Sequence, residues 1–278
     1  MPFCETTSTE LRTIPVAVQR GLLRIPPLSP AATRLYRLSG EKADLQEIAS
    51  LIGTDPALSA AVLRLVNSPL FGVWQPVRGI LQAVALLGLR RLRALATTAA
   101  LRMLVRPEMA SPALTRCWRH SVACALITQD TAANSGSDGD AAYTAGLLHD
   151  MGCFAMLSCW PKEYSQILAT CLPADELQVE FESLGVSHTD AGAFLLERWG
   201  LPAELVVVAR KHHSREGGRS TLLDMVSRSC RIADSLGFAL TAKAALDNAP
   251  DHSLERLIPR QNTSWLRVAD GINQLDCA

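Results

Sequence analysis

The chain has 278 residues, 48% of them hydrophobic, and its 27 basic and 27 acidic residues give a formal net charge of zero. This length and apolar content suffice for one large domain or two smaller ones. The balanced charge argues against a general nucleic-acid binder, which carries a basic excess. No apolar run approaches the roughly 20 residues of a transmembrane helix, and the N-terminus shows no apolar signal segment. We therefore expect a cytoplasmic protein with no membrane partner.

Helical patterns dominate the sequence, and only 5% of its residues are aromatic. We predict an all-α fold, a helical bundle of two lobes. Asp44 opens a capping box, and Asp55 precedes a proline at the first helical position, so each predicts a helix start. A long helix is expected over about 80–105, where Gly88 would let another backbone approach closely.

A proline-containing break at Arg106–Pro112 is the predicted boundary between the two lobes. The predicted divisions are an extension over 1–17, an N-terminal helical lobe over 18–110, a second helical lobe over 111–245, and a tail over 246–278 with a possible final helix near 263–274. Helices of the second lobe are expected at about 114–133, 141–158, 162–171, 188–199, 202–212 and 220–236. The eight cysteines form no C-x-x-C pair, so we expect reduced and mostly buried thiols.

The histidines form an ordered series along the second lobe. Five of the six fall there, one is followed directly by an aspartate, and a second aspartate closes the series: His120, His149, Asp150, His188, His212, His213 and Asp234. Neutral imidazoles and carboxylates together can hold divalent cations. Buried histidines can also satisfy carboxylates through hydrogen bonds without any metal, so both interpretations stay open.

Three spaced motifs of the N-terminal half resemble a known family. They are Arg24–Leu28, Ile52–Ser68, which contains Gly-Thr-Asp-Pro and ends in Asn-Ser, and Ile80–Arg93. Together they resemble the HDOD domain, the HD-related output domain of bacterial signalling proteins, over about residues 18–240. The resemblance implies a helical regulatory module that acts by binding a protein or small-molecule partner, without catalysis.

The histidine series is similar to that of the HD phosphohydrolase superfamily, which includes the HD-GYP proteins. The matching residues lie in Trp118-Arg-His, Leu148-His-Asp-Met-Gly, His188-Thr-Asp, Lys211-His-His and Ala233-Asp. The resemblance implies one metal held by His120, His149, Asp150 and Asp234, with Asp150 bridging to a second held by His188, His212 and His213. One or two ions of iron, manganese or zinc would then be bound, and Asp150 would be catalytic in an active enzyme.

Two departures set this chain apart from the active HD-GYP enzymes. Cys153 follows Asp150-Met-Gly where those enzymes carry a lysine nearby, and no Gly-Tyr-Pro follows His213. Degradation of cyclic di-GMP is therefore poorly supported. The alternative to a regulatory protein is a metal-dependent phosphohydrolase of the HD type, acting on a nucleotide or another phosphate ester.

A local basic stripe is the second candidate for partner binding. Its members are Arg90, Arg91, Arg93 and Arg102. The stripe is either a solvated helix face or a docking site for an acidic signalling protein or a nucleotide. Nucleic acid is an unlikely partner, given the net charge.

Overall fold

The computed structural model describes residues 14–38, 44–68, 74–105, 111–214 and 221–241, together with residue 270. Every regular element in these ranges is helical, which confirms the all-α prediction. The first helices are α1 (Val16–Leu22), α2 (Pro30–Leu35), α3 (Leu45–Gly53), α4 (Pro56–Val66) and α5 (Ile80–Val105). They are followed by α6 (Pro112–Asn134), α7 (Gly139–Leu148), α8 (Met151–Cys159), α9 (Pro161–Thr170), α10 (Glu176–Leu184), α11 (His188–Arg198), α12 (Ala203–Lys211), α13 (Leu222–Ala233) and a π-helical turn at Asp234–Phe238. Apart from residue 270, the predicted tail and final helix lie outside the described residues.

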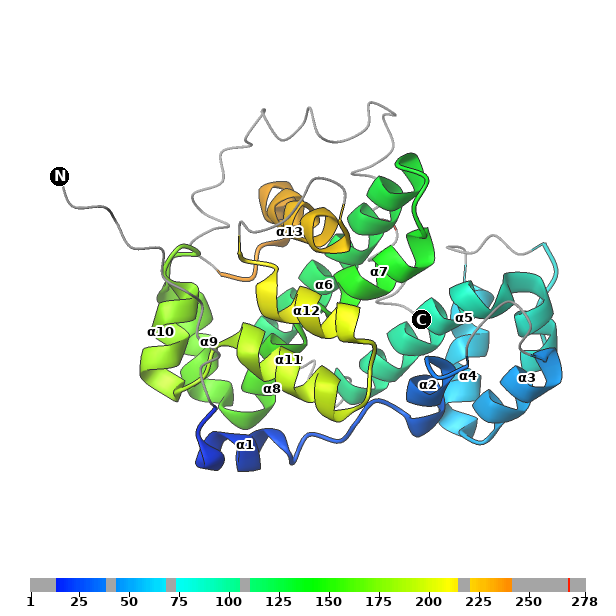
Figure 1. Cartoon of the computed structure of the whole chain (residues 1–278), viewed down its shortest axis with the longest axis horizontal. Coiled ribbons are helices and arrows are strands. Elements are labelled where there is room, and N and C mark those ends of the chain that lie inside the picture. Colours follow the sequence, from blue (N-terminus) through cyan, green and yellow to red (C-terminus); the bar gives the residue numbers. More distant parts are fainter. Residues whose placement is uncertain are drawn as a thin grey trace.

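The helices form two lobes (Figure 1). Helices α2–α5 make one lobe, and α6–α13 make the other. Both predicted N-caps of the first lobe are confirmed: the Asp44 side chain accepts a hydrogen bond from Gln46 N, and the Asp55 side chain from Leu58 N at 2.9 Å. These caps satisfy backbone N–H groups that a helix start leaves unpaired.

Helix α1 lies against the second lobe. It runs across the predicted start of the N-terminal lobe at residue 18, and it packs against α8. Gly21 of α1 faces the Trp160 ring, and a Cβ at this position would lie at an ordinary contact distance of 3.7 Å from it. The segment from α1 to α2 therefore contacts both lobes, because α2 packs against α3 and α5.

The predicted continuous helix over 80–105 is wrong at Gly88. This residue has φ 71° and ψ 170°, a combination open almost only to glycine, and it breaks α5 in two. No other part of the described chain comes within 4 Å of a Cβ at this position. Gly88 therefore serves a backbone turn and not the close helix approach that the sequence suggested.

The predicted helix over 141–158 is also divided. It separates into α7 and α8 at His149 and Asp150, and Asp150 has φ −99° and ψ 28°. This conformation lies in the sparsely populated bridge region, where many active-site residues are found. The break turns Asp150 out of the helical register.

Glycines bring α8 and α11 into direct backbone contact behind this break. A Cβ at Gly152 would lie 1.8 Å from the His188 carbonyl oxygen, and one at Gly192 would lie 2.9 Å from Gly152 N. Only glycine fits at either place. Gly152 and Gly192 together therefore permit the close packing of α8 and α11.

No single helix of the described chain is long and apolar enough to cross a membrane. Helices α3 and α4 pass that test only as a pair bent by 116°, and both pack against α5. Of the six cysteines in these ranges, five are buried, one is partly exposed, and all are free thiols, as predicted.

Candidate metal centre

The histidine series converges inside the second lobe. His120 lies on α6, His149 and Asp150 lie at the break between α7 and α8, His188 begins α11, and His212 ends α12. The four imidazoles and the Asp150 carboxylate are almost completely buried. His213 follows His212 and lines an open cavity beside them.

Each buried imidazole is held by its Nδ1 atom. The partners are Phe238 O for His120 at 2.9 Å, Gly146 O for His149 at 2.7 Å, Ala209 O for His212 at 2.9 Å, and the Glu180 carboxylate for His188 at 2.9 Å. A carbonyl or carboxylate oxygen can only accept, so Nδ1 carries the proton. Each Nε2 atom is then directed into the cluster, as in histidine metal ligands, and it presents a lone pair wherever the ring is neutral.

The Asp150 carboxylate separates the four Nε2 atoms into two pairs. Its Oδ2 atom lies 3.4 Å from His120 Nε2 and 3.1 Å from His149 Nε2. Its Oδ1 atom lies 3.0 Å from His212 Nε2 and 3.7 Å from His188 Nε2. This division follows the two sets that the resemblance implied.

Three of these buried polar atoms lack a hydrogen-bond partner: His149 Nε2, His212 Nε2 and Asp150 Oδ1. They lie close to one another, but without hydrogen-bond alignment. Unsatisfied buried polar atoms cost roughly 1–3 kcal/mol each. A self-contained hydrogen-bond network would have paired them, so their convergence fits a shared cation better.

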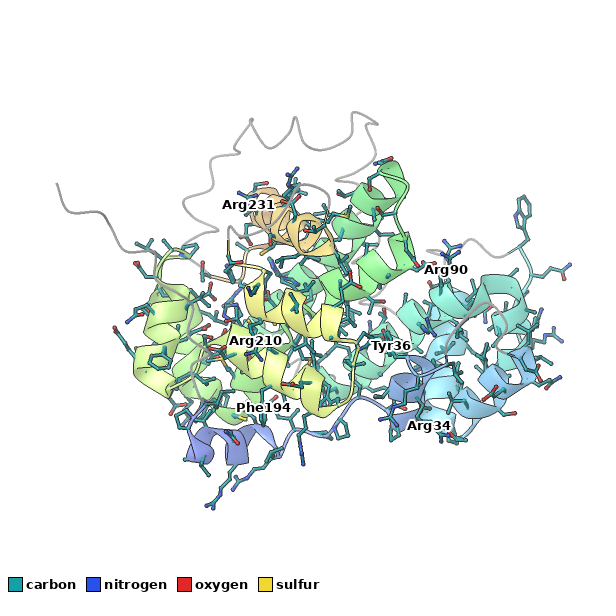
Figure 2. All side chains as sticks on the ribbon, in the orientation of Figure 1. Arg34, Tyr36, Arg90, Phe194, Arg210 and Arg231 are labelled. Atoms are coloured by element: carbon teal, nitrogen blue, oxygen red, sulfur yellow. The ribbon has the colours of Figure 1, made fainter. Side chains whose placement is uncertain are left out.

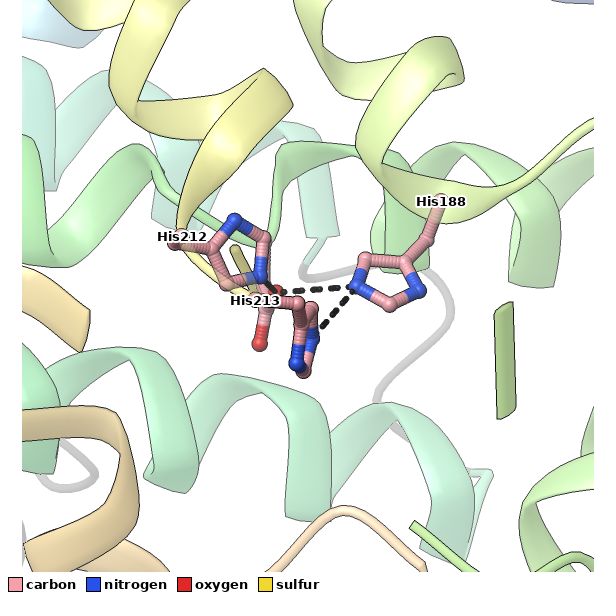
Figure 3. Close-up of side chains that lie close together, drawn as sticks. His188, His212 and His213 are labelled. Atoms are coloured by element: carbon pink, nitrogen blue, oxygen red, sulfur yellow. Dashed lines mark hydrogen bonds and ion pairs between the residues drawn. The ribbon is translucent and has the colours of Figure 1, made fainter. Parts of the chain in front are cut away.

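His213 joins the second pair. Its Nε2 atom lies 3.1 Å from His188 Nε2, and Figure 3 shows the rings of His188, His212 and His213 turned toward one another. The donor atoms of these three histidines and Asp150 all lie within 4.8 Å of one another, a grouping that could hold a metal ion.

Burial keeps two of the imidazoles neutral. It lowers the pKa of His120 and of His212 to about 4, so both present a free lone pair at neutral pH. Burial also disfavours protonation of His188, but the Glu180 carboxylate outweighs it and raises the pKa of His188 to about 10. A cation beside His188 would have to displace a proton.

Asp234 is placed differently from the other predicted ligands. Its nearest carboxylate oxygen lies 3.4 Å from His120 Nδ1, the ring nitrogen already bonded to Phe238 O. Cys230, one helical turn earlier, lies on the other side of the ring, with Sγ 3.5 Å from His120 Nε2. The donor atoms of His120, His149 and Cys230 form a second grouping within 4.8 Å.

Glu180 is a functional candidate that the sequence reasoning missed. It is fully buried, accepts a hydrogen bond from His188 N at 2.7 Å, and accepts another from Tyr164 OH at 2.8 Å. It lies on α10, a helix that was not predicted. An acidic residue facing the apolar side of a short helix, eight positions before a histidine, was the available signal.

A cavity of about 850 Å³ opens beside the cluster. Its walls include His120, Asp150 and His213 on one side and Arg231 of α13 on another, and Figure 2 marks Arg231 on the outer helix. The volume lies within the range of small-molecule sites. An anion in this cavity could reach both the cluster and the guanidinium group.

The arginine stripe does not form one exposed surface. Arg93 donates to the carbonyl oxygens of Leu35 and Leu38, and Arg102 lies over the Trp118 ring at 5.9 Å. Arg90 and Arg91 remain exposed, and Figure 2 shows Arg90 where α5 faces α7. Partner binding through the stripe stays a prediction, which now depends on the two exposed members.

Comparison with known proteins places the chain in a family. The family model of the HDOD domain matches residues 25–215. An uncharacterised protein of Treponema pallidum (strain Nichols) is 29% identical over 252 residues, covering 88% of this chain and 46% of that protein, so the chain spans about half of this relative.

Solved structures agree with this assignment. An HDOD domain protein of unknown function from Geobacter sulfurreducens has a TM-score of 0.65 and 26% identity, over 96% of this chain and 93% of its own. A provisionally assigned phosphohydrolase from Shewanella amazonensis SB2B shares the fold, with a TM-score of 0.67 and 23% identity over 92% of this chain and 98% of its own. Because the family model covers well over half of the sequence, the chain belongs to the HDOD domain family.

Proposed function

We propose that this chain is a regulatory HDOD protein whose histidine cluster binds one or two divalent metal ions and, through them, a phosphate-bearing small molecule in the adjoining cavity. The observation that carries the proposal is the convergence of unpartnered buried donors, His149 Nε2, His212 Nε2 and Asp150 Oδ1. A cation bound among these atoms would give all three a common partner.

The donor set suits the proposed metals. Imidazole nitrogens and carboxylate oxygens bind zinc, iron and manganese, and Nδ1 anchoring of each ring is the arrangement expected around such ions. When bound, the ions would supply positive charge to phosphate oxygens. The chain's own residues would do the rest: Asp150 spans the two donor pairs, Glu180 orients His188, and Arg231 offers a further charge for the ligand.

The same helices connect the cluster to the N-terminal lobe. Helix α7 ends just before His149 and packs along α5, where Tyr143 OH and Thr98 Oγ1 lie 3.1 Å apart. A ligand that fixes the position of α7 would therefore bias how the two lobes pack, because a ligand shifts an equilibrium toward the state it binds better. This gives binding without catalysis a route to regulation.

A metal-dependent phosphohydrolase is the second candidate. The specific feature in its favour is a carboxylate whose two oxygens face different histidine pairs, as in paired-metal sites that activate water. This chain lacks the lysine and the Gly-Tyr-Pro motif of the active HD-GYP enzymes, and their absence weighs against cyclic di-GMP as the substrate.

The first test is the metal content of the purified full chain by mass spectrometry, with Asp150→Ala beside it. We expect one or two equivalents of iron, manganese or zinc, reduced at least tenfold in the variant. Asp138→Ala, an exposed aspartate at the start of α7, is the control that should keep its metal. No metal in the wild-type chain, even after incubation with each ion, would overturn the proposal.

Ligand binding and hydrolysis then separate the two candidates. With metal loaded, ADP as a probe nucleotide should bind in calorimetry, and Arg231→Ala should weaken that binding while leaving the metal content unchanged. Turnover of p-nitrophenyl phosphate that disappears in Asp150→Ala would favour the hydrolase. ADP binding without turnover of either compound would favour the regulator.

A further inference from the structure

We infer that Cys230 supplies a thiolate ligand at the first donor pair, which makes this site selective for a thiophilic ion such as zinc or ferrous iron. The inference rests on the proposed function, because it assumes that the cluster binds metal. It deepens that proposal by assigning a ligand that the histidine series does not contain.

The position of Cys230 carries the first step. It lies on α13, is only 7% exposed, and its Sγ atom lies 3.5 Å from His120 Nε2. His120 Nδ1–H donates a hydrogen bond to Phe238 O, so the Nε2 atom of the neutral ring is an acceptor. In the metal-free protein, the Cys230 thiol therefore donates its hydrogen to His120 Nε2. Sulfur and nitrogen therefore face one another across the space that a cation would occupy.

The neighbouring histidines supply the other donors of this grouping. His149 Nε2 is buried, has no hydrogen-bond partner and belongs to the same grouping as His120 and Cys230. Asp150 Oδ2 lies 3.4 Å from His120 Nε2 and 3.1 Å from His149 Nε2, beside the two nitrogens. Three protein donors drawn from histidine and cysteine are the arrangement of catalytic zinc sites, which leave a fourth position open.

Helical spacing explains why Cys230 is better placed than Asp234. Residues four apart share one helix face, so the two side chains both approach His120. Asp234 reaches the ring at Nδ1, which is already occupied, and its side chain is 33% exposed. Cys230, which is buried, instead contacts His120 Nε2, the ring nitrogen that faces the other histidines.

The chemistry of sulfur then separates the two donor pairs. Binding at Cys230 forms one metal–sulfur bond and releases one proton to solvent, which makes affinity rise with pH. Thiolate favours zinc and iron, whereas the second group, Asp150 with His188, His212 and His213, offers only nitrogen and oxygen. One site should therefore discriminate against manganese and magnesium more strongly than the other.

Cobalt(II) substitution tests the assignment directly. The metal-free full chain is titrated with cobalt, and we expect a sulfur-to-cobalt charge-transfer band in the near ultraviolet. Cys230→Ser should lose this band and bind zinc at least tenfold more weakly at one site, while still binding cobalt at the second group. Cys171→Ser is the matched control, since Cys171 is also 7% exposed and belongs to no donor grouping in the described chain.

A second measurement uses the unaltered chain, in case Cys230→Ser fails to fold. Cys230 lines the cavity, so iodoacetamide should label it in the metal-free protein, and zinc should slow that labelling at least tenfold. Labelling of Cys171, mapped by mass spectrometry, should not respond to zinc.

The outcomes distinguish the two proposals. Cobalt binding without the charge-transfer band, or a band that persists in Cys230→Ser, overturns the thiolate assignment and leaves the metal centre standing. Failure of the wild-type chain to bind cobalt or zinc overturns both.

Discussion

Replacing Gly152 by alanine should disrupt the metal centre through the backbone and not through any ligand. The added Cβ would lie 1.8 Å from the His188 carbonyl oxygen, while ordinary contacts begin at 3.4 Å. Helices α8 and α11 would have to separate by about 1.6 Å, the difference between these distances. Overpacking of this kind costs about 3 kcal/mol, since the obstacle is backbone and cannot rotate away.

The same displacement would reach the donor atoms. Asp150 precedes Gly152 by two residues, and the clash is with the backbone of His188. The distance of 3.7 Å between Asp150 Oδ1 and His188 Nε2 would therefore change directly. Metal sites tolerate deviations of about 0.2 Å, far less than this shift. We expect the second donor group to lose its metal, and the melting temperature to fall by roughly 6–12 °C at 2–4 °C per kcal/mol.

Circular dichroism melting and metal analysis of the same preparation check both effects. Gly53→Ala is the control, because Gly53 ends α3 and no neighbouring atom lies within 4 Å of its added Cβ. It should be neutral or stabilising by about 0.5–1 kcal/mol. If Gly152→Ala melted with the wild-type chain and kept full metal, the close backbone approach would not be what holds the site together.

Other substitutions probe single contacts. Arg93→Ala should cost about 2 kcal/mol, because it removes the side-chain donor from two partly buried carbonyl oxygens. Arg90→Ala should cost less than about 0.5 kcal/mol, because its ion pair is exposed; urea unfolding compares the two variants. Asn67→Ala should cost about 2 kcal/mol in the same assay, since its amide pairs with both backbone groups of one loop residue; a value near zero would contradict this. Tyr164→Phe removes one hydrogen bond to Glu180, the carboxylate that holds His188, and should weaken metal binding by about tenfold in a chelator competition. Unchanged metal affinity would show that Tyr164 does not help to orient His188.

Much of the candidate site could be predicted because its residues keep a recognisable order along the chain. His120, His149, His188 and His212 are far apart in sequence, and each brings an Nε2 atom to the same carboxylate. Local capping at Asp55 was equally readable, because it depends only on adjacent residues.

The missed features depend on backbone geometry or on tertiary neighbours. The segment 141–158 is apolar over most of its length apart from His149 and Asp150, so its periodicity could not reveal the break at these two residues. Gly88 was expected to pack, yet its left-handed backbone turns the chain instead. Glu180 and Cys230 became candidates only when folding brought them to His188 and His120.

The break at Asp150 also determines which of the two flanking helices, α7 or α8, can move when the position of the Asp150 carboxylate changes. Toward α8, the chain soon reaches Gly152, where backbone contact with α11 leaves no room to move. Toward α7, it reaches a helix that touches the α6 backbone at Gly146 and contacts α5 through side chains, including Tyr143 and Thr98. Side-chain contacts can slide or change rotamer more easily than backbone contacts, so the α7–α5 contact is the one through which a displacement should reach the N-terminal lobe.

Hydrogen exchange can test this direction, because metal binding should alter protection on both sides of one contact. We expect amides in the second half of α5 to exchange more slowly with zinc bound, and those of α3, which packs mainly against α2, α4 and α5, to change much less. Slower exchange confined to α8 and α11 would show that the signal stays within the second lobe. If zinc binds and the exchange rates of the α5 amides do not change, metal binding is not coupled to the N-terminal lobe through this helix.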